Sequence, residues 1–138
     1  MTETTDIGGQ DRQLLHTRTV QCRGYLRSDG NWDIEGRMTD VKSFSMANVD
    51  RGGQIEAGEP LHDISLTLTI DRTMTIKAAR AAIDYSPFRQ CDAITDAFQK
   101  LVGLRILPGF SKQVKALFSG TKGCTHLLEL LPPISTTA

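Results

Sequence analysis

The chain has 138 residues, enough for one domain whose apolar core needs neither disulfides nor metals. Its 16 basic and 16 acidic residues cancel, which argues against a nucleic-acid backbone or an anionic membrane as a partner. No apolar stretch is long enough to span a bilayer, and the polar N-terminus lacks the hydrophobic segment of a signal peptide, so we expect a cytoplasmic protein. The 3 cysteines are an odd number without close spacing, so no disulfide framework is expected.

The first half of the chain predicts β-structure. Residues 1–12 are expected to form a flexible leader, and residues 13–138 a single domain. Alternating apolar and polar residues predict strands over residues 15–27, 31–40, 62–71 and 74–84. Ser28–Asn31 is typical of a hairpin turn, and residues 41–60, rich in glycine, predict a long loop.

The second half predicts helices over residues 88–103, 109–120 and 123–131. Four strands followed by three helices predict an α+β fold, an antiparallel four-stranded meander with three helices packed on one face. The chain ends at ISTTA directly after the last helical pattern. That ending leaves two interpretations open, a trimmed chain or a helix that ends at the surface.

Three unusual side chains are predicted to point toward the interface between sheet and helices. His62 has the parity of the apolar residues in its strand, while Asp63 faces away. Cys91 and Cys124 each share a helical face with apolar residues, and both lie near helix starts, where the dipole favours a thiolate. His126 lies about 200° around the helix from Cys124, so it joins this group only if the first turn is irregular. Each residue alone also fits simple packing in a core.

Other residues give weaker signals. Tyr85 and Arg89, before the first helix, could border the mouth of a pocket, and Trp32 lies on the apolar face of its strand. Cys22 also has inward parity, and its role stays open. His16 and the charged residues of the hairpin are expected at the surface. The sequence contains no phosphate-binding loop, nucleophile elbow or paired CxxC motifs.

Several segments, taken in order, resemble a bacterial family known only as a domain of unknown function. They are DGNWDIEGRMTD, AGEPLHDISLTLTID, SPFRQC, LVGLRILPGF and GCTHLLEL, and the resemblance covers Leu15 to Ala138. It implies a link to proteins for the catabolism of aromatic acids and lignin-derived dimers. Members of that family usually continue beyond the last helix, so a missing wall or lid is left open.

GEPLHDISLTLTI, IKAARAAIDYSPFRQC and GCTHLLEL also resemble, more distantly, the layout of NifU-like iron–sulfur scaffold proteins. This resemblance implies that His62, Cys91, Cys124 and His126 take the positions of the scaffold's ligands. The chain departs from the pattern in having a histidine at the first cysteine position and Cys-Thr-His in place of an adjacent histidine–cysteine pair. Both departures argue against cluster assembly while keeping a site in the same place.

Three hypotheses of function follow. The first is a cofactor-independent lyase that releases a small carbonyl such as formaldehyde from a small aromatic acid or phenol. Its catalytic residues would be His62 as base with Asp63, Tyr85 and Arg89, and its substrate-binding residues Cys91, Cys124 and Trp32. The second is a zinc or iron–sulfur protein that uses His62, Cys91, Cys124 and His126. The third is a non-catalytic protein-interaction domain, and a homo-oligomer is compatible with all three.

Overall fold

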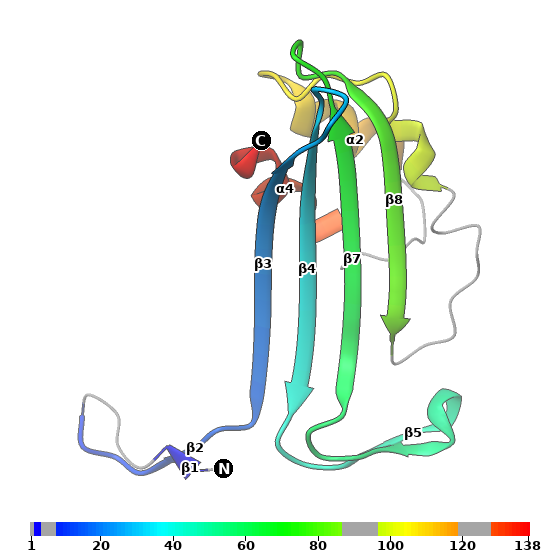
Figure 1. Cartoon of the computed structure of the whole chain (residues 1–138). Helices are drawn as coiled ribbons and strands as arrows, with labels where there is room; N and C mark the ends of the chain where they lie inside the picture. The colour runs from blue at the N-terminus through cyan, green and yellow to red at the C-terminus, as the bar shows by residue number, and fades with distance from the viewer. Residues whose placement is uncertain (1, 4–7, 87–96, 119–127) are drawn as a thin grey trace.

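The computed structural model describes residues 2–3, 8–86, 97–118 and 128–138. Its centre is one antiparallel sheet of long strands in the order β3-β4-β7-β8 (Figure 1). The bounds are β3 His16–Leu26, β4 Trp32–Lys42, β7 Pro60–Ile70 and β8 Ile76–Tyr85. These strands lie close to the segments in which apolar residues alternate. The β3–β4 hairpin turns where predicted, with Gly30 at a φ of 88°.

Two short ladders accompany this sheet. Near the N-terminus, β1 (Thr2–Glu3) pairs with β2 (Arg12–Gln13). β5 (Met46–Asn48) pairs with β6 (Gly53–Ile55) across the 3₁₀ helix η1 (Val49–Arg51). The predicted long loop over residues 41–60 is therefore wrong in part. The glycines read as loop residues instead close a hairpin, because Gly52 and Gly53 have φ angles of 78° and 103°.

The predicted fold class is also wrong. The described residues are mostly β-structure, and their α-helices are α2 (Phe110–Phe118) and α4 (Leu131–Thr137), with a 3₁₀ turn η2 (Phe98–Leu101). The fold is therefore not a meander covered by three helices, and it does not have the layout expected from the NifU-like resemblance. Of the predicted helix 88–103, the described part forms only η2. The predicted helix 123–131 lies largely outside the described residues, while α4 occupies Leu131–Thr137, beyond the predicted end of that helix. Prolines in its first turn suit a helix start.

The core lies on one face of the sheet, at the end that carries the β3–β4 turn. The η2, α2 and α4 segments gather at this end (Figure 1). The even-numbered residues of β4 and β7 point into this core, as alternation requires. The buried apolar residues include Ile34, Met38, Ile64, Leu66, Leu68, Phe98, Phe110, Leu130 and Ile134.

Candidate active site

Near the opposite end, the same inner face of the sheet carries charged residues in place of apolar ones. Asp40, near the end of β4, has no solvent exposure. Its register partners are Arg18 on β3 and His62 on β7. Directly opposed residues on neighbouring strands share a face, so the three side chains must meet.

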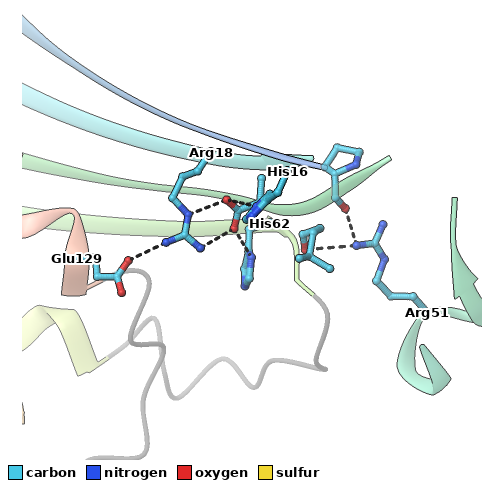
Figure 2. A network of polar contacts seen from close by, with 8 residues as sticks. His16, Arg18, Arg51, His62 and Glu129 are labelled. Carbon is cyan, nitrogen blue, oxygen red and sulfur yellow. Dashed lines mark hydrogen bonds and ion pairs between the residues drawn. The ribbon is translucent and has the colours of Figure 1, made fainter. Parts of the chain in front are cut away.

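All contacts of this group centre on the Asp40 carboxylate. Arg18 binds both oxygens, with Nε donating to Oδ1 at 2.7 Å and Nη2 donating to Oδ2 at 3.0 Å. His62 Nδ1 lies 2.7 Å from Oδ2, and His16 Nε2 lies 3.2 Å from Oδ1. Glu129, just before α4, adds an ion pair to Arg18 Nη1 at 3.5 Å. Figure 2 shows the group, which we call the Asp40 cluster: His16, Arg18, Asp40, His62 and Glu129.

The cluster keeps Asp40 ionised. Burial opposes the charged form, but hydrogen bonds from Arg18 and His62 outweigh it and lower the pKa of Asp40 to about 2. The same hydrogen bond raises the pKa of Arg18. An ionised carboxylate can only accept, so His62 Nδ1 carries the proton that it shares with Asp40. In the neutral ring, the basic lone pair is then on Nε2.

A second arginine fixes the start of β7 beside the cluster. Arg51, at the end of η1, donates from Nη1 to the carbonyl oxygens of Pro60 at 2.5 Å and Leu61 at 3.4 Å (Figure 2). Its guanidinium also lies 5.2 Å from the centre of the Tyr85 ring, a cation–π contact. These contacts hold the backbone directly before His62.

The structure brings some predicted site residues together and separates others. His62 is buried on the inner face as predicted. Tyr85, at the end of β8, is exposed and joins the same end of the sheet through Arg51. Asp63 faces the other way, where its carboxylate accepts from Arg37 Nε at 2.9 Å and Nη2 at 2.7 Å.

Trp32 and Cys22 lie away from the cluster, against the apolar core. Trp32 is opposite Ile70 in the register, whereas Asp40 is opposite His62. Eight residues of strand separate the two positions, roughly 26 Å. The remaining predicted site residues lie outside the described part of the chain: Arg89, Cys91, Cys124 and His126.

Asp40 and Arg18 were not predicted as site residues. His16 was predicted at the surface; it is exposed there, and its ring still reaches the Asp40 carboxylate. A signal was present, because Asp40 has the parity of Ile34 and Met38, and Arg18 that of Val20 and Cys22. Charged residues with inward parity on three predicted strands are unusual enough to be a site hypothesis.

Next to the cluster, a cavity of about 590 Å³ opens between α2 and α4. Its lining is mainly apolar, with polar groups from Ser111, Lys115 and Glu129. The apolar part comes from Phe110, Val114, Phe118, Leu128, Leu131 and Pro132. Glu129 lines the cavity and also pairs with Arg18 of the Asp40 cluster, so it links the two; the other residues of the cluster are not part of the cavity lining.

The described residues contain no group of three or more histidine, cysteine, aspartate or glutamate side chains placed to hold a metal ion. At Asp40, a metal ion would compete with the Arg18 guanidinium, which already binds both carboxylate oxygens. Within the same residues, no helix has the length and apolar character needed to cross a membrane.

Fold and cluster together define a small β-sheet protein with a buried aspartate–histidine pair beside an apolar cavity. The chain belongs to the family described as "Protein of unknown function (DUF2889)", which matches residues 16–138. This confirms the expected membership of a family of unknown function. Searches of curated proteins and of solved structures each gave no match.

Proposed function

We propose that the protein is a small-molecule enzyme in which His62 acts as general base and Asp40 positions it. The observation that carries the proposal is the 2.7 Å contact between His62 Nδ1 and the buried carboxylate of Asp40. A carboxylate on Nδ1 fixes the ring orientation, leaves Nε2 as the basic atom and stabilises the imidazolium that forms on proton uptake. Asp40 is therefore a positioning residue, and His62 is the catalytic one.

The reaction that we propose is a cofactor-independent lyase step on a hydroxymethyl-bearing aromatic acid or phenol. His62 Nε2 removes the hydroxyl proton, and the O–H electron pair becomes the second bond of a new carbonyl. The C–C bond to the hydroxymethyl carbon breaks, and its electron pair stays on the carbon that bore the hydroxymethyl group. That carbon takes the proton back from His62, so the products are formaldehyde and an aromatic compound shorter by one carbon.

The cavity between α2 and α4 supports an aromatic substrate. Its volume of about 590 Å³ lies in the range of ligand pockets, and its phenylalanine and leucine side chains suit an apolar ring. Lys115 is a polar group on its wall that suits a carboxylate or phenolate. Arg89 remains the residue predicted from the sequence for the same role.

Two histidines on one carboxylate provide a matched test. His62→Gln removes the proposed base from Oδ2, and His16→Gln removes a ring of the same size from Oδ1. Formaldehyde release from a panel of hydroxymethyl-bearing phenolic compounds is measured with a coupled formaldehyde assay. We expect His62→Gln to lower turnover by about 100-fold to 10,000-fold and His16→Gln by less than about tenfold. Equal losses in two folded variants would show that the cluster is structural.

The second candidate is a metal centre. A histidine that ligates a metal usually donates its other ring N–H to a carboxylate, and the Asp40–His62 contact has this form. The further ligands would be Cys91, Cys124 and His126. Metal analysis of protein purified without a histidine tag separates the candidates. Stoichiometric zinc or iron that is lost in Cys91→Ser and Cys124→Ser would favour the metal centre, and its absence together with turnover would favour the lyase.

A further inference from the structure

The two edges of the main sheet differ in how well they are protected. On the β8 edge, the Ile76 N–H donates to the Leu104 carbonyl and the Ile76 carbonyl accepts from Gly103 N–H, both at 2.8 Å. The Gln99 side chain binds the Ala79 carbonyl at 2.5 Å, and two β-bulges interrupt the β7–β8 ladder. Such features stop an edge from pairing with another chain.

The β3 edge has none of these features. The strand is 11 residues long, and every residue except the half-buried Cys22 is exposed. Its ladder with β4 runs without a bulge, and its sequence, HTRTVQCRGYL, contains no proline or lysine. No described strand pairs with its outer side, and Figure 1 shows β3 at the open margin of the sheet. A long, regular edge of this kind is a template for a further strand.

The hydrogen bonds at the two ends of β3 show which groups face this edge. Arg27 N–H donates to the Asn31 carbonyl, and the Leu15 carbonyl accepts from Ser43 N–H. On the β3 side, both groups, the Arg27 N–H and the Leu15 carbonyl, belong to odd-numbered residues. In an antiparallel ladder the bonded residues alternate, so odd residues bond to β4. The N–H and carbonyl groups of the even residues from His16 to Leu26 therefore point to the open edge.

We propose that β3 pairs antiparallel with β3 of a second copy of this chain, about a two-fold axis at Gln21. With a two-fold axis perpendicular to the sheet, the two residues of each opposed pair must point to the same face. Their numbers are then both even or both odd, so the sum of the two numbers is even. The axis at Gln21 is the one that pairs all 11 residues of β3. It also lets the even residues form the hydrogen-bonded pairs. Axes at Arg18 or Arg23 would place like charges in direct opposition.

This register gives a compatible set of side-chain pairs. Thr19 lies opposite the partner's Arg23, and Arg18 lies opposite the partner's Gly24, so no like charges face one another. Val20, Tyr25 and Leu26, which are 48%, 44% and 73% exposed, gain neighbours across the interface. The partner's Leu26 lies opposite His16, so the second copy shields one side of the Asp40 cluster. The two copies together form a continuous eight-stranded sheet. This proposal does not rest on the proposed activity.

Cross-linking tests the register. Gln21 lies opposite the same residue of the partner subunit in a non-hydrogen-bonded pair, with Cα atoms about 4.5 Å apart, within the range of a disulfide. Gln21→Cys, on a background of Cys22→Ser, Cys91→Ser and Cys124→Ser, should form a covalent dimer on oxidation. Thr19→Cys is the matched control, since its two copies would lie roughly 13 Å apart. Equal cross-linking of both variants, or of neither, would overturn the proposed register.

Charge variants with the native cysteines provide a second test. Sedimentation equilibrium of the unmodified chain should give twice the monomer mass of 15.2 kDa. Thr19→Lys places like charges opposite Arg23 twice and should raise the dimer Kd about tenfold, whereas Thr19→Glu should lower it. Far-UV circular dichroism checks that both variants are folded. A monomeric wild-type chain, or a dimer that responds to neither substitution, would overturn the proposal.

Discussion

Asp40 is a fully buried carboxylate that keeps its charge because its neighbours replace the water it has lost. Arg18 supplies two charge-assisted hydrogen bonds and stays partly exposed, so its own dehydration cost is moderate. His62 supplies a third bond at 2.7 Å. Removal of the carboxylate charge would leave Arg18 facing the inner side of the sheet without its main partner.

The lowered pKa of Asp40 predicts a specific acid sensitivity. The carboxyl titrates at about 2 in the folded chain and at 3.8 when unperturbed, so its stabilisation is complete above about pH 4. As the pH falls from about 4 to about 2, on the order of 2 kcal/mol of unfolding free energy should be lost. Urea unfolding at a series of pH values below about 5 measures this slope.

Asp40→Asn is the variant that isolates this effect. At neutral pH it should lower the unfolding free energy by about 2 to 4 kcal/mol, because it leaves the arginine without its charged partner. It should also unfold with a shallower pH slope below about pH 4 than the wild-type chain. An unchanged slope would assign the acid sensitivity to other carboxyl groups, such as Asp71, whose pKa is also lowered to about 2.

Of the residues in this cluster, only His62 was identified from the sequence as a candidate site residue. Alternation in residues 62–71 places His62 inward, and it gives Asp40 the same orientation on its own strand. The contact also needs the register between β4 and β7, which are separated by the β5–β6 hairpin. Alternation predicts the face of the sheet to which each side chain points, but it does not predict which residue of the neighbouring strand lies opposite. His62 and Asp40 were therefore both predictable as inward-facing residues, and the contact between them was not.

At the scale of elements, α4 packs closely on the sheet because Gly36 of β4 has no side chain. A Cβ atom at Gly36 of β4 would come within 2.8 Å of Cδ1 and Cγ1 of Ile134. Ile134 is fully buried, so its side chain has little room to move. Glycine at this position sets how closely α4 approaches β4.

Gly36→Ala should therefore lower the unfolding free energy by about 1 to 3 kcal/mol through overpacking. Gly24→Ala is a matched control on the neighbouring strand, where the nearest atom to the new Cβ, Ile34 Cδ1, lies at an ordinary 3.7 Å. That variant should be neutral or more stable by up to about 1 kcal/mol. Urea denaturation of both variants measures the difference. Similar effects of the two substitutions would contradict a close approach of α4 at Gly36.

Strands were easier to predict than helices in this chain, for a physical reason. In β4 and β7 the even-numbered residues from Ile34 to Asp40 and from Ile64 to Ile70 are buried, while most of the odd-numbered residues between them are not. The described helices are only nine and seven residues long, so a periodic pattern is short in both. The predicted helix 109–120 agrees with α2 within two residues, whereas the limits of α4 were not predicted. The last helical pattern was predicted over residues 123–131, whereas α4 begins at Leu131 and has two prolines in its first turn.

At the scale of the whole molecule, the apolar core at the end of the sheet with the β3–β4 turn should make that end the more resistant to local opening. Most of β7 is buried, and it is paired on both sides. The β5–β6 ladder contains only three residue pairs and projects from the opposite end (Figure 1). Local opening of such a small unit needs far less free energy than unfolding of the central strands.

Hydrogen exchange measured by mass spectrometry should resolve this difference. Amides of Met46–Asn48 and Gly53–Ile55 should exchange about 100-fold or more faster than those of Ile64–Ile70. The slow group should follow global unfolding and respond to denaturant accordingly. Equal protection of both groups would mean that the small hairpin unfolds only together with the main sheet.

The charged end of the sheet also has a consequence for behaviour on heating. The free-energy cost of dehydrating charged groups falls as temperature rises, while the contribution of each buried apolar area levels off. The contacts of Asp40 with Arg18, His16 and His62 should therefore form a growing share of the total stability in a warmer environment. Relatives adapted to heat would be expected to keep this ion network and to vary the apolar residues under the helices.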